Sequence, residues 1–324
     1  MTELAIEALD LKKEFPGPRM GPRKRGPSVK ALQDVNFRIK EGENYCLLGP
    51  NGSGKTTLIR CILGLLKAEG SINVMGYEIP KERKKVIPKI GYMPQDISLY
   101  PDLSVKETMN FFGRLYGLSK KNELSKAVEK SLELFLFKEW KNTIVENLSG
   151  GMKRRLSLAC ALIHEPELVF LDEPTVGVDP NLRLSFWDYF NNLSKNGVTI
   201  ITTTHVMDEA EKSRKIGFMR NGKLIAEGTY QDLKRKVPES RKLIISTDLE
   251  DTKKIADLVN EKFKLKSRSQ DYKLEIFYNV DSILEEILSF IKDYVKILSI
   301  QTVEPSLEDI FIFFSKRDNN GVKK

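Results

Sequence analysis

The chain contains little of several residue types that would fix its class at once. Its 324 residues include only three cysteines, two histidines and two tryptophans. Cys46, Cys61 and Cys160 are scattered in apolar surroundings without the spacing of metal ligands, which predicts small core residues and argues against a disulfide framework. An odd and sparse cysteine count is typical of a protein from the reducing cytoplasm.

Long apolar runs are also missing. No stretch reaches the ~18 to 20 consecutive apolar residues that a membrane-spanning helix requires. Residues 1–7 carry acids and no basic region ahead of an apolar core, so we expect no signal peptide. With 40% hydrophobic and 30% charged residues, the composition is that of a soluble globular chain, long enough for one large domain and a smaller one.

The net charge of +8 is unevenly distributed along the sequence. Residues 241–324 contain 15 basic and 15 acidic residues, whereas the first 240 residues contain 38 basic and 30 acidic. Five basic residues and no acid lie in the segment 16–30, whose prolines and glycines predict a loop. A basic loop is compatible with nearby phosphates or an anionic membrane, and it is only weak evidence for nucleic acid.

Short apolar strands alternate with helical patterns over the first 235 residues, which favours an α/β domain. Asn221 and Gly222 add the strongest short-range signal for a hairpin. The predicted strands are 4–11, 35–39, 45–48, 90–93, 168–171, 199–203, 216–219 and 223–226, and residues 71–79 are predicted to form a small hairpin or a strand. The predicted helices are 56–66, 104–137, 149–163 and 181–195, with a short helix opened by 207–212.

A charged stretch around Pro238 predicts a domain boundary, with one domain over 1–235 and a second over 241–324. The second domain is predicted to be a small α+β unit. Its expected strands are 243–246, 274–278 and 295–301, and its expected helices are 252–263, 280–294 and 306–314. The last helix places Leu307, Ile310, Phe311 and Phe314 on one face.

Residues 49–56 fit the phosphate-binding pattern G-x-x-x-x-G-K-[ST] in full. The pattern comprises Gly49, Pro50, Asn51, Gly52, Ser53, Gly54, Lys55 and Thr56, with Thr57 as a further nucleotide contact. It follows a predicted strand and opens a helix, so backbone N–H groups can surround a phosphate at a helix N-terminus. We expect Lys55 to reach the β- and γ-phosphates of a nucleotide and the Thr56 hydroxyl to bind Mg²⁺.

Two carboxylates, Asp172 and Glu173, end the apolar strand 168–171. Beside a phosphate loop, Asp172 is expected to hold the Mg²⁺ directly or through water, and Glu173 to polarise the attacking water. These features fit any P-loop nucleotidase. The missing guanine-reading motif, Asn/Thr-Lys-x-Asp, lowers the GTPase alternative.

The segment Leu148-Ser149-Gly150-Gly151-Met152 decides between the remaining classes. With it, the chain resembles the ATP-binding cassette (ABC) ATPases, whose ordered motifs can be matched over 1–235. The resemblance implies a P-loop NTPase cassette with a RecA-like core, an antiparallel β subdomain and an α-helical subdomain. It also implies ATP and Mg²⁺ as cofactors, and Lys55 and Glu173 as catalytic residues.

Four further positions match single motifs of that family. Gln95 corresponds to the Q-loop glutamine, a catalytic residue and Mg²⁺ ligand, and His205 to the switch histidine, which positions the attacking water. Asp179 corresponds to the D-loop aspartate. Phe15 is the best match to the aromatic residue that stacks on adenine. His164 lacks such a context and is expected at the surface of a helix end.

Ser149, Gly150 and Gly151 stand at the start of a helix, where free N–H groups and a hydroxyl can bind an anion. Ser149 is also expected to act as a helix N-cap. The resemblance implies that this signature is too far from the ATP of its own chain. Two subunits, expected to be identical, must therefore pair head to tail. Met152 stands where the family usually has glutamine.

Residues 99–118 and 303–311 resemble the exporter cassettes of the drug-resistance (ABC-2) group. The resemblance implies a cytoplasmic ATPase subunit, held on the inner face of the membrane by a separate transmembrane permease. A soluble cassette ATPase acting on DNA or the ribosome is the alternative. DNA-repair cassettes carry long coiled coils and ribosomal ones carry two cassettes, so no nucleic-acid partner is expected. The transported substrate stays open.

Overall fold

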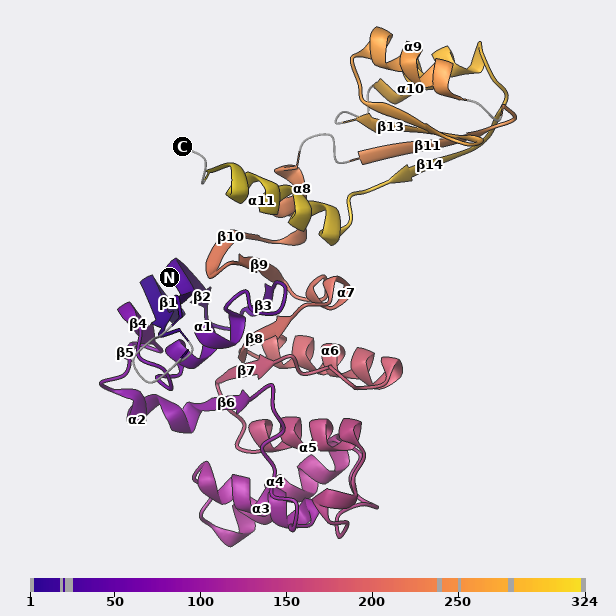
Figure 1. Ribbon diagram of the computed structural model, residues 1–324. Coiled ribbons are helices and arrows are strands. Elements are labelled where there is room, and N and C mark those ends of the chain that lie inside the picture. The colour runs from indigo at the N-terminus through magenta and orange to yellow at the C-terminus, as the bar shows by residue number, and fades with distance from the viewer. Residues whose placement is uncertain are drawn as a thin grey trace. The chain divides into compact units, whose positions relative to one another are not determined.

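The computed structural model describes residues 3–17, 20, 26–237, 241–249, 252–278 and 283–321. Within it the chain divides into two compact units, Met1–Gly228 and Thr229–Lys324 (Figure 1). This division falls a few residues before the boundary proposed from the charged stretch. Helix α8, Tyr230–Arg235, therefore belongs to the second unit rather than the first.

The first unit is built on a six-stranded sheet in the order β10-β9-β3-β8-β7-β6. All neighbouring strands are parallel except β9 and β10, which form the hairpin expected at Asn221 and Gly222. Strands β3, β7 and β8 are buried along their whole length, as in parallel sheets covered on both faces. The bounds are β3 Asn44–Leu48, β6 Ile90–Met93, β7 Leu168–Asp172, β8 Thr199–Thr204, β9 Lys215–Arg220 and β10 Lys223–Gly228.

A second, antiparallel sheet has the order β2-β1-β4-β5. Its strands are β1 Leu4–Phe15, β2 Val29–Lys40, β4 Glu69–Val74 and β5 Tyr77–Glu78. It shares one core with helix α1, Lys55–Ile62, and with the inner strands of the first sheet. Strand β2 begins six residues before its predicted start. Arg19, Arg23, Lys24 and Arg25 of the basic segment lie outside the described residues.

The helices of the first unit gather a second apolar core. The stretch predicted as helical over 104–137 forms two helices, because Gly117 takes a left-handed conformation with φ 100° between them. Ser104 caps the first of these helices in a capping box with Glu107. The bounds are α2 Arg83–Val86, α3 Val105–Leu115, α4 Lys121–Leu134, α5 Gly150–Leu162, α6 Pro180–Lys195 and α7 Met207–Ala210, with short 3-10 turns at Ile87–Lys89 and Val145–Asn147. Among the described helices, none combines the length and apolar character needed to cross a bilayer.

The second unit is an antiparallel sheet in the order β12-β13-β11-β14, with α9 and α10 on one face (Figure 1). Alternate residues of β11 and β13 pack against these helices. Strand β12 was not predicted because its sequence, Ser-Arg-Ser-Gln, is entirely polar. The bounds are β11 Arg241–Thr247, α9 Lys253–Phe263, β12 Ser267–Gln270, β13 Lys273–Tyr278, α10 Leu284–Lys292, β14 Ile297–Val303 and α11 Leu307–Gly321.

His164 is not the surface residue that the sequence indicated. Its ring stacks on Tyr116 at 3.9 Å between centroids, and its Nε2 lies 3.2 Å from the Ile90 carbonyl oxygen. The ring is therefore half-buried, and burial lowers the pKa of His164 to about 4.

This depressed pKa predicts a loss of stability in mild acid. Between pH 6.5 and about 4 the unfolded state binds the proton and the folded state does not, so the free energy of unfolding falls as the pH is lowered through this window. After allowance for solvent exposure we expect about 2 kcal/mol. Urea unfolding at pH 7 and pH 4.5 measures the loss, which should shrink in His164→Gln. An unchanged pH dependence in that variant would contradict the prediction.

Candidate functional site

The loop between β3 and α1 is shaped by glycines that no other residue can replace. A Cβ on Gly49 would lie 2.1 Å from the Met219 carbonyl oxygen, and one on Gly54 would lie 2.5 Å from that of Ala31. Gly54 also has φ 107° at the N-cap of α1. Gly52, in contrast, faces open space. The loop is thus fixed against the β-sheet on one side and open toward a ligand on the other.

Lys55 lies buried beneath this loop. Its Nζ donates hydrogen bonds to the carbonyl oxygens of Gly49 at 2.7 Å and Pro50 at 3.1 Å. Burial lowers the pKa of Lys55, while the negative charges of Glu173 and Asp172 oppose that change. An ammonium has three donors, so one is left for a phosphate above the loop.

Asp172 ends strand β7 with its carboxylate completely buried. Its Oδ1 accepts a hydrogen bond from the Thr203 hydroxyl, but its buried Oδ2 has no hydrogen-bond partner within the described structure. An unpaired buried carboxylate oxygen is costly, and oxygen is the ligand that Mg²⁺ prefers. The unpaired Oδ2 of Asp172 therefore suits a magnesium ion, and the other predicted donors, Thr56 and Gln95, line the cavity over the loop.

Glu173 meets two of the predicted catalytic side chains. Gln95 Nε2 donates to Glu173 Oε2 at 3.3 Å, and His205 Nδ1 lies 3.3 Å from Glu173 Oε1. Glu173 has φ 52°, and its backbone N–H donates to the Thr203 hydroxyl at 3.0 Å. The structure thus brings Gln95, Glu173 and His205 together from three separate segments.

A cavity of about 400 Å³ lies over the phosphate loop. Its lining contains the predicted nucleotide contacts from Asn51 to Thr57 together with Gln95 and Glu173. Phe15 is not part of that lining, whereas Val29, its cross-strand neighbour, is. The Phe15 ring instead lies 5.1 Å from Lys13 Nζ. The full lining is Val29, Lys30, Ala31, Gln33, Asn51, Gly52, Ser53, Gly54, Lys55, Thr56, Thr57, Gln95, Glu173 and Asn221.

The signature residues and Asp179 lie outside this cavity, within the described part of the chain. Ser149 is the N-cap of α5 and accepts a hydrogen bond from the Met152 N–H at 3.2 Å. Asp179 caps α6 in the same way, accepting from the Leu182 N–H at 3.0 Å. Ser149, Gly150 and Asp179 are all exposed. A single chain therefore presents the signature to solvent.

Arg154 is a residue at this site that the sequence reasoning missed. It projects from α5 with 6% of its surface exposed and donates to the carbonyl oxygens of Gln95, Asp172 and Glu173. Burial lowers the pKa of Arg154, while the charges of Glu173, Asp172 and Asp96 oppose that change. One guanidinium thus joins the signature helix to the two segments that carry Gln95 and Glu173.

Replacement of Arg154 should weaken both the fold and the chemistry. Arg154→Met keeps most of the volume but removes the donor from two buried carbonyl oxygens, of Asp172 and Glu173, and from the partly buried one of Gln95, so we expect a loss of about 2 to 4 kcal/mol in the free energy of unfolding. Lys153→Met on the same helix is the control, because Lys153 makes only an exposed contact to Glu146. Urea unfolding compares the two. Equal small losses would show that the Arg154 contacts do not stabilise the site.

Glu209 was also missed. It is 4% exposed and accepts hydrogen bonds from the hydroxyls of Thr175 at 2.6 Å and Thr204 at 2.8 Å. The Thr204 hydroxyl in turn accepts from the Val206 N–H at 3.0 Å. This buried network holds the backbone on both sides of His205.

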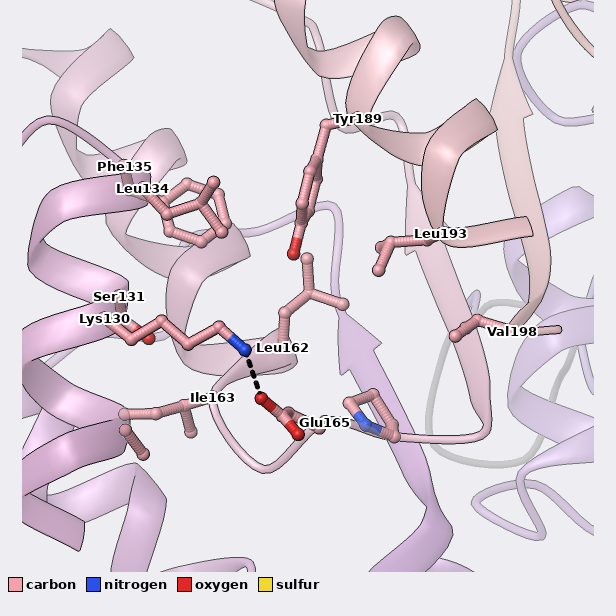
Figure 2. Close-up of a pocket in the computed structure, with 12 residues that line it drawn as sticks. Lys130, Ser131, Leu134, Phe135, Leu162, Ile163, Glu165, Tyr189, Leu193 and Val198 are labelled. Atoms are coloured by element: carbon pink, nitrogen blue, oxygen red, sulfur yellow. Dashed lines mark hydrogen bonds and ion pairs between the residues drawn. The ribbon is translucent and has the colours of Figure 1, made fainter. Parts of the chain in front are cut away.

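Another cavity, of about 240 Å³, lies between α4, α6 and the end of α5 (Figure 2). Its walls are mainly apolar, and the ion pair between Lys130 and Glu165, 2.5 Å apart, joins two of its sides. None of the predicted site residues belongs to its described lining. The cavity over the phosphate loop is therefore the candidate functional site.

Comparison with known proteins identifies the family. The profile described as "ABC transporter" matches residues 32–176. The linearmycin resistance ATP-binding protein LnrL of Bacillus subtilis is 36% identical over 301 residues, which cover 88% of this chain and 94% of LnrL. The chain belongs to the ATP-binding proteins of ABC transporters.

Further comparisons refine this placement within the family. A profile for the C-terminal domain of DrrA1-3-like ATP-binding proteins matches residues 228–313. The daunorubicin resistance protein DrrA3 of Streptomyces coeruleorubidus is 39% identical over 216 residues, 66% of this chain and 68% of DrrA3. The probable multidrug transporter protein YbhF of Escherichia coli is 42% identical over 233 residues, 72% of this chain, but this chain spans only 38% of YbhF. The resemblance to ATP-binding proteins of the drug-resistance group, which the sequence predicted, is confirmed.

The fold comparison agrees. The cassette MJ0796, solved as a dimer in a post-hydrolysis state with ADP and Pi, superposes with a TM-score of 0.62 at 26% identity. The match covers 69% of this chain and 98% of that one. The predicted P-loop cassette fold is thereby confirmed.

Proposed function

We propose that this chain hydrolyses MgATP in the cavity over the phosphate loop and that the energy drives a separate exporter permease. The observation that carries the proposal is the position of Glu173, held between Gln95 and His205 beside the loop that contains Lys55. A carboxylate in that place can accept a proton from a water aligned with the γ-phosphate.

Each side chain has a distinct part in this reaction. The remaining donor of Lys55 binds the β- and γ-phosphates, and Glu173 takes the proton of the attacking water. His205 and Gln95 fix the Glu173 carboxylate, and His205 can turn its ring toward the γ-phosphate. Thr56, Asp172 and Gln95 would hold Mg²⁺, which would supply charge neutralisation at the phosphate oxygens.

The exposed signature supports a dimer of identical chains. In the proposed dimer, Ser149 and the N–H groups of Gly150 and Gly151 bind the γ-phosphate on the other chain, so each ATP lies between two subunits. MJ0796, of the same fold, has been solved as a dimer. The head-to-tail contact between the two cassettes then depends on ATP, and hydrolysis opens that contact.

The partner in the membrane is proposed to bind the apolar surface near the Q-loop. Tyr100, Phe111 and Leu115 are 52%, 39% and 67% exposed, and the rings of Tyr100 and Phe111 pack edge to face at 5.0 Å. Exposed apolar patches mark interaction sites. A permease bound here would hold the chain on the cytoplasmic face of the membrane and receive the movement of the helical segment. The transported class is proposed to be a drug-like compound, following the multidrug, linearmycin and daunorubicin relatives.

Affinity purification from detergent-solubilised membranes tests the proposal. The tagged chain should retain a multispanning membrane protein and hydrolyse ATP, and chelation of Mg²⁺ should stop hydrolysis. Leu115→Glu should lose the membrane protein while keeping ATP binding, because residue 115 is exposed and lies outside the cavity lining. Equal recovery of the membrane protein with Leu115→Glu would contradict the proposed surface. Salt-dependent binding of nucleic acid without a membrane protein would contradict the function.

A further inference from the structure

Strand β14, Ile297–Val303, is an unprotected edge of the sheet in the second unit. It lies at the end of the strand order β12-β13-β11-β14, so one side of its backbone has no neighbouring strand in the described sheet. Its sequence, Ile-Leu-Ser-Ile-Gln-Thr-Val, contains neither a charged residue nor proline. The five residues from Leu298 to Thr302 are all exposed. Natural edge strands usually carry charges, prolines or a covering segment, because an open edge pairs readily with another strand.

The opposite edge of the same sheet shows the protection that β14 lacks. Strand β12, Ser267–Gln270, has four residues, all polar, and includes Arg268. Short and charged edge strands resist pairing. The difference between the two edges indicates that β14 is kept open for a partner.

Apolar side chains accompany the open backbone. Ile300 lies opposite Ile245 in the register of β11 and β14, and Ile245 is fully buried on the face that packs in the core of this unit. Ile300 therefore points to the same face, but it is 47% exposed because it lies at the margin of that core. Leu298 is 60% exposed, and the pairing between β11 and β14 shifts its register at this residue, near the start of β14. The regular pairing region is thus Ser299–Val303.

We infer that β14 pairs in antiparallel fashion with β14 of a second copy of this chain, joining the two C-terminal sheets into one. Antiparallel pairing of identical strands follows a two-fold axis, which is the symmetry of a closed homodimer. With the axis near Ile300, the two Ile300 side chains meet and Ser299 faces Gln301. No charges oppose each other, so the strand is complementary to itself.

The second copy is the occupant that this strand fits. A charged partner would find no opposite charge along Ile297–Val303, and a soluble partner strand would have to be equally apolar. This step rests on the proposed function, since the paired cassettes bring two copies together. Once they are linked, strand pairing becomes effectively intramolecular, so a weak contact suffices to keep the chains associated after ATP is gone.

Single cysteines along β14 test the register directly. Ser299→Cys, Ile300→Cys, Gln301→Cys and Val303→Cys are oxidised one at a time in the nucleotide-free full-length chain. The distance between equivalent residues grows by about 6 to 7 Å for each position away from the axis, so disulfide formation should peak at Ile300, be lower and similar at Ser299 and Gln301, and be lowest at Val303. The unmodified chain is the blank, because Cys46, Cys61 and Cys160 are buried. Gln270→Cys on the protected edge is the control. A flat profile, or crosslinking equal to that of Gln270→Cys, would overturn the inference.

A charge at the axis provides the second measurement. Ile300→Lys places two ammonium groups opposite each other and should weaken nucleotide-free association roughly tenfold in sedimentation. Ile312→Lys is the matched control, since Ile312 lies in the same unit and is 42% exposed. Equal association of both variants would overturn the strand pairing. ATP-driven dimerisation of the cassettes, measured separately in a Glu173→Gln background, reports on the proposed function and does not depend on β14.

Discussion

Glu173→Gln is expected to stop hydrolysis and leave ATP bound. Glutamine keeps the size of the side chain and can still meet Gln95 and His205, but it cannot accept a proton from the attacking water. Removal of a general base lowers rates by about 10²- to 10⁴-fold. Phosphate release under saturating MgATP measures the loss, and gel filtration should show a stable ATP-bound dimer. A hydrolysis rate near that of the unmodified chain would contradict the assignment of the base.

Lys55→Ala is the contrasting variant. The Lys55 Nζ both supports the loop through Gly49 and Pro50 and is proposed to bind the phosphates, so its removal should abolish nucleotide binding. Titration with a fluorescent ATP analogue separates the two variants. Glu173→Gln should bind at least as tightly as the unmodified chain, and Lys55→Ala should bind too weakly to saturate.

The phosphate loop and the two carboxylates could be predicted from sequence because each is a local feature. A glycine-rich turn between a strand and a helix needs no distant residue to define its shape. The structure places Lys55, Gln95 and Glu173 in one cavity lining because strands β6 and β7 end beside the loop that follows β3. Parallel strands bring their carboxyl ends to the same edge of the sheet. The order of the motifs along the chain was therefore sufficient to predict that these residues lie close together.

Arg154 and Glu209 could not be predicted in the same way. Arg154 follows the signature as one of three consecutive basic residues, and only the fold shows that it, rather than Lys153, points inward to three carbonyl oxygens. In the sequence, Glu209 resembles any polar residue of a helix, and only the fold shows the two threonine hydroxyls that donate hydrogen bonds to it. Both depend on side-chain direction, which composition and spacing do not encode.

The prediction of secondary structure from the sequence was wrong where the local pattern was weak or ambiguous. The polar strand β12 has no apolar alternation to reveal it, and it is held in the sheet by its neighbour β13. One continuous helix was predicted over 104–137 because the apolar residues on both sides of Gly117 have helical spacing. Helix α8 lay at the expected boundary, and its contacts with α11, such as Tyr230 to the Pro305 carbonyl oxygen, assign it to the second unit.

Ser149→Arg is expected to abolish ATP-driven dimerisation while a single chain still binds nucleotide. Ser149 is exposed and lies outside the cavity over its own phosphate loop, so a bulky cation there should not disturb binding within one chain. It should block the approach of the second chain's γ-phosphate. Sedimentation in a Glu173→Gln background measures dimerisation, and titration with an ATP analogue measures binding. Ser149→Ala is the milder comparison: it removes the N-cap, at a cost of about 1 kcal/mol in stability, and the hydroxyl proposed to bind the phosphate, but it adds neither bulk nor charge, so dimerisation should weaken less than in Ser149→Arg.

A mixing experiment identifies which chain's ATP the signature serves. Ser149→Arg chains retain Lys55, and Lys55→Ala chains retain Ser149, so a mixed head-to-tail dimer contains one intact composite site and one doubly defective site. Neither variant alone should show ATP-driven dimerisation, whereas the mixture, again with Glu173→Gln in both chains, should form ATP-dependent dimers that hold a single ATP. A signature that served the nucleotide of its own chain would leave both chains defective, and mixing would then restore nothing.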